Sequence, residues 1–385
     1  MNTHLYPVSF RKYSLILIYS FLALVVIDGC MEFYFEKLYG DLTRIGYFTE
    51  RDFGMRSPQK VIPFELLKEY SLAEAEILVI GDSFSENHIW QTRLVADGLK
   101  VATIHWKDLK APHVEGLLPD KLGETLRTSG FKGRYVIIES VERLFQLRMQ
   151  ALSAEYNPIV KHNNTVINVA PFTNRERISM SNLNGANWNI EALSNTIKLS
   201  LMPSNYLKSM KVYAIKFDGC QLFSNRLCNY SLFIDEDFEK KTFDSINNVL
   251  AVNEHLRAVG IQSIWLVIPD KSTIYLGYGK LNKYPYENIW NTFAQYPEII
   301  APNLGVIFTR KSRTVTDFYM PDNTHLSASG FLYLGDIVLS GLHQLVGWDD
   351  VRYPSSTLTK HLDSYFVPAY LLSTSNTRNN KGVLK

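Results

Sequence analysis

The sequence has little of what marks several large functional classes. Its formal net charge is only +2, which gives no reason to expect a nucleic-acid partner. The nine histidines show no spacing typical of metal ligands, so we expect no metal site and no other cofactor. Neither an internal repeat nor a low-complexity tract is present. The apolar content of 46% is ample for a core, and 385 residues permit one large α/β domain with insertions or two domains.

A long apolar run lies near the N-terminus, from Tyr13 to Ile27, directly after Arg11 and Lys12. It has the length of a signal-peptide core, and no small-x-small cleavage site follows it. Apolar residues resume beyond Asp28, so we expect the helix to continue toward the ~20 residues that a spanning helix needs. We therefore predict an uncleaved anchor, with residues 1–12 in the cytoplasm by the positive-inside rule.

Two other interpretations of this segment stay open. One is that the run is a cleaved export signal. The other is that Cys30, after Gly29, is a lipoprotein attachment site, although Asp28 fits a lipobox poorly. Under each interpretation the rest of the chain lies outside the cytoplasm.

Cysteine is scarce, with three residues in the chain. Besides Cys30, only Cys220 and Cys228 occur, and they bracket a short polar loop. In an exported protein such a pair predicts a disulfide, with two reduced buried cysteines as the alternative.

The clearest local pattern is a buried strand that ends in Gly81-Asp82-Ser83. Apolar residues at helical spacing follow over 86–100 and predict a helix. Ser83 is therefore expected on a strand–turn–helix junction, where a serine is held at the carboxyl edge of a sheet and backbone N–H groups face an oxyanion. The alternative is an ordinary β-turn, because all three residue types favour turns.

A second pattern lies near the end of the chain, where Asp322 and His325 stand three residues apart before an apolar helical stretch over 331–345. Together with Gly81-Asp82-Ser83, this Asp-x-x-His resembles the SGNH (GDSL-like) hydrolase superfamily in both order and context. The resemblance implies Ser83 as nucleophile, His325 as base and Asp322 as the acid that orients it. The alternative is that Asp322 caps the helix and His325 is a surface histidine.

Apolar strands expected over 77–80, 101–106, 134–139 and 264–268 alternate with helical stretches, which predicts a parallel sheet in an α/β fold. The resemblance implies an SGNH/flavodoxin-like three-layer sandwich. We divide the chain into a cytoplasmic end (1–12), a transmembrane helix (13–30), a membrane-proximal lead-in (31–72), the SGNH-like domain (73–347) and a tail (348–385). An asparagine-rich insertion over about 151–240 breaks the α/β rhythm, and it either shapes a substrate groove or is solvent-facing decoration.

The strand over 134–139 ends in Glu139-Ser140-Val141-Glu142-Arg143, where the superfamily would place a Gly-x-Asn-Asp with an oxyanion-donating asparagine. Glu-x-x-Glu-Arg instead resembles alginate acetylation proteins of the AlgX/AlgJ type, which also carry Gly-Asp-Ser-Phe-Ser. In those proteins the Asp/His pair typically precedes the serine motif, whereas here it follows. The resemblance is therefore one of type, not of function in detail.

Further residues are expected near the same edge. Arg143 is a candidate for binding a carboxylate or sugar hydroxyl, or else a structural partner of Glu139 or Glu142. Ser140 is a minor oxyanion-donor candidate. Lys271 and Tyr275, which follow the strand over 264–268, are candidate substrate contacts or ordinary loop residues.

These residue types predict acyl transfer through an acyl-serine. The AlgX/AlgJ resemblance implies O-acetylation of an exported bacterial polysaccharide, with the acyl group supplied by a polytopic membrane acyltransferase partner. It also implies a single-pass inner-membrane protein whose catalytic domain lies in the periplasm. The alternatives are a carbohydrate esterase of the same fold and a non-catalytic glycan-binding assembly component.

Overall fold

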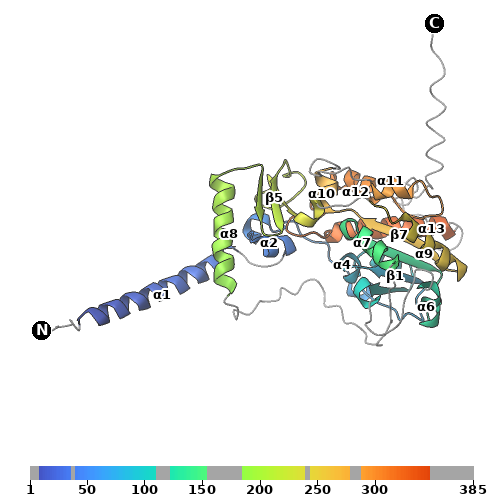
Figure 1. The fold of residues 1–385 in the computed structure, drawn as a ribbon, viewed down its shortest axis with the longest axis horizontal. Helices are drawn as coiled ribbons and strands as arrows, with labels where there is room; N and C mark the ends of the chain where they lie inside the picture. Colours follow the sequence, from blue (N-terminus) through green and yellow to red (C-terminus); the bar gives the residue numbers. More distant parts are fainter. Residues whose placement is uncertain are drawn as a thin grey trace, which may run out of the picture. The chain divides into compact units, whose positions relative to one another are not determined.

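The computed structural model describes residues 8–35, 40–109, 122–153, 184–238, 243–277 and 288–346 (Figure 1). It divides into two compact units. The first unit comprises the described residues of 1–56, 175–234 and 321–323, and the second comprises those of 57–174, 235–320 and 324–385. Each unit is described by itself below.

The second unit is an α/β fold around a four-stranded sheet with the order β2-β1-β3-β7. Its strands are β1 (Ile77–Gly81), β2 (Val101–His105), β3 (Tyr135–Val141) and β7 (Gln262–Ile268). All three strand pairs are parallel. Nearly every residue of β1, β3 and β7 is buried on both sides of the strand, which explains their continuous apolar sequences. The predicted parallel sheet is confirmed.

Among the described helices of this unit, the first five lie in the connections between strands and the last four follow β7. They are α4 (Ser83–Glu86), α5 (Thr92–Ala96), α6 (Leu122–Thr128), α7 (Glu142–Ser153), α9 (Ile246–Ala258), α10 (Lys271–Tyr275), α11 (Ile289–Phe293), α12 (Leu304–Ser312) and α13 (Ala328–Val346). The chain moves from β1 to β2 in one direction along the sheet and then back past β1 to β3. Right-handed crossovers place the helices of these two connections on opposite faces. In agreement, α5 packs with α13, and α6 packs with α9.

The single helix expected over 86–100 is wrong, because α4 ends at Glu86 and α5 covers only Thr92–Ala96. His88 has a φ of 55°, a left-handed conformation that an α-helix does not accommodate. The Asn87 side chain also accepts a hydrogen bond from the N–H of Ile89, at 3.1 Å. Local polar chemistry thus interrupts an apolar pattern with the correct helical period.

The first unit has its own sheet and its own core. It contains α1 (Val8–Phe35), α2 (Asp41–Gly46), α3 (Glu50–Phe53), α8 (Asn184–Leu201) and the antiparallel strands β4 (Tyr206–Ser209), β5 (Val212–Lys216) and β6 (Tyr230–Ile234). Leu42, Phe48 and Phe53 share a buried cluster with residues of α8 and the three strands. Described residues 31–35 and 40–56 of the expected lead-in and 184–234 of the expected insertion therefore form one compact unit, whereas residues 57–72 of the lead-in belong to the second unit. Apolar spacing reveals a buried face but not the distant segment that covers it.

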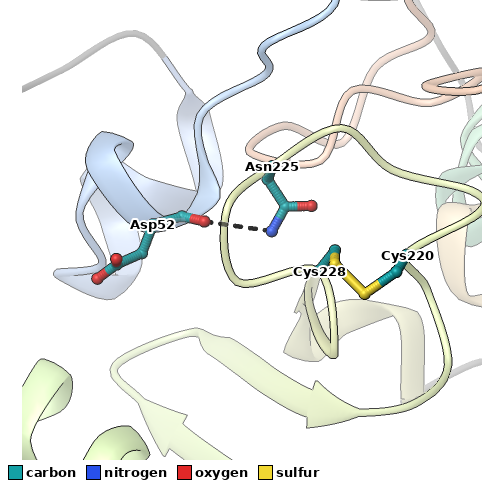
Figure 2. Close-up of a disulfide and its surroundings, with 4 residues drawn as sticks. All are labelled: Asp52, Cys220, Asn225 and Cys228. Carbon is teal, nitrogen blue, oxygen red and sulfur yellow. Dashed lines mark hydrogen bonds between the residues drawn. A yellow bond between two sulfur atoms is a disulfide. The ribbon is translucent and has the colours of Figure 1, made fainter.

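A disulfide joins Cys220 and Cys228 in the first unit, with the two sulfur atoms 1.98 Å apart, as the sequence predicts. The loop between them contacts the end of α3 (Figure 2). The Asn225 side chain donates to the carbonyl of Asp52 at 3.3 Å, and the Leu227 N–H donates to the same carbonyl at 2.9 Å. The bridge therefore closes a loop that is itself fixed to a segment far away in the sequence.

Within the part of the chain that the structure describes, one helix is long and apolar enough to cross a membrane, at Phe10–Phe35 within α1. Its apolar side chains are largely exposed between Phe10 and Ile27. The predicted tail, 348–385, lies outside the described residues.

Candidate active site

Ser83 begins helix α4 immediately beyond the carboxyl end of β1. Asp82 is the N-cap of that helix, and its side chain accepts a hydrogen bond from the N–H of Phe84 at 2.9 Å. An N-cap of this kind satisfies one of the amides that a helix start leaves open and fixes the turn. Ser83 is exposed, while both of its neighbours are buried. The turn therefore presents one hydroxyl from a rigid support.

His325 lies directly at this hydroxyl. Its Nε2 atom is 2.7 Å from the Oγ atom of Ser83, within ordinary hydrogen-bonding distance. Its ring also stacks at a tilt on the ring of Phe84, with centroids 4.7 Å apart. If Nδ1 carries the ring proton, Nε2 accepts from the serine, as a general base must.

A tight turn holds His325 in place. Tyr319 and Leu326 pair as an isolated antiparallel bridge, and the His325 carbonyl accepts from the N–H of Met320 at 3.0 Å. The Oγ atom of Thr324 lies 3.5 Å from Nδ1 of the imidazole. Helix α13 begins directly after this turn, so the imidazole is supported on both sides along the chain.

Asp322, three residues before His325, is buried and belongs by its contacts to the first unit. Its carbonyl accepts a hydrogen bond from the N–H of Leu42 at 3.0 Å. Gly40 is also packed against it, since a Cβ at Gly40 would lie 2.2 Å from the same carbonyl oxygen. The orienting role of the Asp322 carboxylate stays a prediction.

The carboxylate of Asp82 ties the serine turn to β3 and α7. Its second oxygen accepts from the N–H of Val141 at 3.0 Å and from Arg148 at 2.5 Å. Burial by itself raises the pKa of Asp82, but the charge of Arg148 and the backbone donors outweigh it and lower the pKa. Arg148 also donates to the buried Ser140 at 2.6 Å. Asp82 and Ser140 therefore support the turn that carries Ser83. For this reason we do not propose Ser140 as an oxyanion donor.

Glu139, near the end of β3, is fully buried beneath the same turn. One carboxyl oxygen accepts from the N–H of Asp82 at 2.9 Å and from the hydroxyl of Ser85 at 2.7 Å. Burial, and next the charge of Asp82, raise the pKa of Glu139 well above its usual value, so the protonated form is favoured. A Cβ at Gly81 would lie 2.6 Å from that same oxygen, which explains the glycine. The Asp82 N–H is bonded within the fold, which leaves Ser83 as the oxyanion-donor candidate in Gly81-Asp82-Ser83.

Arg143 lies among acidic side chains, of which Asp270 and Asp237 are buried and Glu236 is exposed. Its guanidinium is 2.6 Å from Asp270 and 3.7 Å from both Asp237 and Glu236. Burial by itself lowers the pKa of Arg143, but Asp270 foremost, and next Asp237, outweigh burial and raise the pKa, so the guanidinium stays charged. Glu142 accepts from the N–H of Asp270 at 2.9 Å in the same region. The sequence did not identify Asp270, Asp237 and Glu236 as partners. Their contacts favour the structural alternative for Arg143, and a contact with substrate stays a prediction.

Lys271 and Tyr275 connect the segment after β7 to the turn that carries His325. The buried ammonium of Lys271 donates to the carbonyl of Met320 at 2.9 Å. The hydroxyl of Tyr275 accepts from the N–H of Tyr319 at 3.3 Å, and burial raises the pKa of that hydroxyl. These two residues lie near the reactive edge, as expected, but their described contacts brace the protein rather than face a substrate.

Sequence reasoning did not assign roles to Glu139, Ser85 or Arg148, although each supports the serine turn. For Glu139 a signal existed, because an acidic residue inside an apolar strand must find partners when the strand is buried. No comparable signal marks Arg148, which lies on a helix that is polar in many positions.

Among the residues that the structure describes, no group of three or more His, Cys, Asp or Glu side chains is arranged to hold a metal ion. Comparisons with family models, with curated proteins and with solved structures found no match. The functional assignment must therefore come from the geometry of the site.

Proposed function

We propose that this protein is a membrane-anchored, extracytoplasmic O-acyltransferase of the SGNH-like type, which acetylates an exported bacterial polysaccharide through an acyl-serine. The observation that carries the proposal is the 2.7 Å contact between Nε2 of His325 and the exposed Oγ of Ser83. A nucleophile and a base within hydrogen-bonding reach are the minimal apparatus for this chemistry.

The topology supports the same proposal. The order β2-β1-β3-β7 matches the first four strands of the flavodoxin-like arrangement, in which the crossover direction reverses between β1 and β3. Ligands of open α/β sheets bind outside the carboxyl ends of the strands at that reversal. Ser83 follows β1 at this edge, and the Glu139 carboxyl that supports its turn comes from the end of β3.

In the proposed first step, His325 takes the proton of Ser83 while Oγ attacks the acyl carbonyl carbon. The Ser83 N–H stabilises the tetrahedral oxyanion. When the intermediate collapses, the bond to the donor oxygen breaks, and that oxygen receives the proton from His325. In the second step, His325 takes a proton from a sugar hydroxyl, which attacks the acyl-serine. Collapse then transfers the acyl group to the sugar oxygen and returns the proton to Ser83.

Anchoring by α1 would place this chemistry at the inner membrane, with the second unit in the periplasm. The acyl donor would be supplied there by a polytopic membrane acyltransferase. Water in place of the sugar hydroxyl in the second step gives an esterase, which uses the same residues.

The test follows a labelled acetyl group. Purified protein is incubated with a small labelled acetyl ester, with and without an oligosaccharide acceptor. We expect label on Ser83 in a short incubation, and transfer to sugar that requires the acceptor. Ser83→Ala should abolish both, whereas Ser71→Ala should change neither, since this exposed serine precedes β1 and belongs to the opposite edge of the sheet. Release of acetate alone would favour the esterase, and activity retained by Ser83→Ala would refute the nucleophile.

A further inference from the structure

Helix α8 of the first unit presents an unusual outer face. Four large apolar side chains on it, Ile190, Leu193, Ile197 and Leu201, are 63%, 41%, 43% and 75% exposed. They recur at intervals of three and four residues, so they form one stripe along the helix. We call this set the α8 stripe. Exposed apolar side chains gathered in this way mark an interaction surface more often than scattered ones do.

The stripe is not the face by which α8 packs on its own unit. Trp188, Ala192, Asn195 and Leu199 are buried and form that face. At about 100° per residue, the stripe centres on the opposite side of the helix. Both sides of α8 are therefore apolar, and the described residues of the first unit cover only one of them.

The end of α1 is attached to α8. Phe35 packs on Trp188 with ring centroids 6.3 Å apart, and Asp28 accepts a hydrogen bond from Asn189 at 2.6 Å. Phe35 thus contacts Trp188 on the packed face of α8. Asp28, which lies earlier in α1, contacts Asn189, the next residue of α8, which is about 100° further around that helix toward Leu193. The remainder of α1 therefore leaves α8 on the side of the stripe.

The two helices cross, with α8 running across the end of α1 (Figure 1). A spanning helix stands roughly along the membrane normal, so a helix lying across its end runs along the membrane surface. The stretch from Tyr13 to Ile27 is about 23 Å long at 1.5 Å per residue. This stretch is shorter than the ~30 Å of bilayer hydrocarbon. Asp28 directly follows it, so Asp28 and the Asn189 to which it is bonded are expected at the membrane interface.

We propose that the α8 stripe lies in the outer surface of the lipid bilayer that α1 crosses, so that the first unit is held against the membrane at two points. Phe33 of α1, 90% exposed, adds an aromatic side chain at the same level. A helix with one apolar face that lies in the membrane interface is a known mode of attachment, and its strength grows with the apolar area buried. This inference rests on the anchoring role of α1 within the proposed function, and not on the chemistry of Ser83.

The experiment measures the surroundings of single side chains in the full-length protein. In a Cys30→Ser background, Leu193→Cys and Ile197→Cys are each labelled with an environment-sensitive fluorophore. Val306→Cys is the matched control, because this side chain on α12 of the second unit is exposed to a similar degree, 42%. The proteins are reconstituted into vesicles of phosphatidylethanolamine and phosphatidylglycerol, with or without a spin-labelled lipid, and insertion of α1 is checked by flotation.

We expect labels at Leu193 and Ile197 to lose most of their emission to the lipid quencher, with blue-shifted spectra, while the Val306 label responds to aqueous iodide. Equal lipid quenching at Val306, or iodide quenching at both stripe positions, would overturn the proposal. Disulfide-linked dimers of the unlabelled Leu193→Cys protein, together with no lipid quenching of the labelled protein, would identify a second copy as the occupant and overturn the proposal as well. Circular dichroism checks that each labelled variant is folded.

Failure of this inference is distinguishable from failure of the proposed function. The quenching requires no acyl donor, so it should persist in Ser83→Ala. A protein that floats with vesicles and acylates sugars but shows no stripe quenching would refute only the α8 stripe. A protein that does not float would refute the anchor and the stripe together.

Discussion

The Nε2 atom of His325 lies 2.7 Å from the Oγ atom of Ser83, although 242 residues separate the two in the sequence. The serine is fixed by a turn that Asp82 and Glu139 hold from below. The histidine is fixed by a turn that includes Met320. The carbonyl of Met320 accepts a hydrogen bond from the buried ammonium of Lys271. Two independently supported turns thus meet at one hydrogen bond.

Nucleophile and base should behave as one unit. Ser83→Ala and His325→Ala should each lower the rate of acetyl transfer by several powers of ten, and the double variant should lose about as much as either single variant. The measurement is the steady-state rate of all three variants with a small acetyl ester. Losses that add in free energy would mean that the two side chains act separately.

Asp322 is expected to orient His325 and stabilise its charged form. Asp322→Asn should leave the fold intact, because the two side chains have nearly the same shape and the backbone contact with Leu42 is kept. The rate should fall by about three to four powers of ten if Asp322 completes a triad. A wild-type rate in this variant would indicate that Ser83 and His325 work without an acidic third member.

Glu139 should make the protein less stable as pH rises. Its pKa is raised in the folded state by burial and by Asp82, so the folded protein retains a proton that the unfolded chain releases above pH 4.5. Stability from the protonated group is complete below the unfolded pKa and is lost as pH rises toward the folded pKa. Glu139→Gln should keep the hydrogen bonds and lack this dependence. Urea unfolding of both proteins at a series of pH values from 4.5 upward tests this, because the stability is lost above the unfolded pKa.

Comparing the wild-type protein with Glu139→Gln also cancels the contributions of other titrating groups to the pH dependence of stability. The lowered pKa of the buried His88 makes stability rise with pH below its usual value of 6.5, but it does so equally in both proteins. The lowered pKa of Asp82 acts only below its usual value of 3.8. If the difference in unfolding free energy is constant across the range, Glu139 is ionised in the folded protein.

The Cys220–Cys228 bridge should stabilise the first unit. Replacing both cysteines with serine should lower its unfolding free energy by about 2–3 kcal/mol, because the bridge restricts a short loop in the unfolded chain. Hydrogen exchange of β5 and β6 reports on this unit separately from the other. Cys30→Ser is the matched control, since Cys30 is an exposed free thiol and its loss should change nothing.

The chain beyond α1 should be outside the cytoplasm and attached to the membrane. Protease added to intact spheroplasts should digest the C-terminal domain, because Arg11 and Lys12 favour a cytoplasmic N-terminus. Cells lysed before digestion give the reference for complete cleavage. Protection of the domain, or a soluble mature protein that starts near residue 30, would contradict this arrangement.

The sequence by itself was sufficient for the parallel sheet, the position of Ser83 after β1 and the bond between Cys220 and Cys228. A strand buried on both faces is a continuous apolar run, and a short loop brings two cysteines together by chain connectivity alone. Each of these features is indicated by residues near one another in the chain, although the strands that pair in the sheet are distant in sequence.

Only the tertiary structure decided which distant residues meet. It turned Arg143 toward Asp270 and Asp237, brought Glu139 under the serine turn, and joined residues 40–56 to the described part of the insertion in one core. Periodicity and composition indicate that a side chain is buried, but not which partner buries it. Burial also sets the charge state of Glu139, because the pKa depends on neighbours that lie close in space and far apart in sequence.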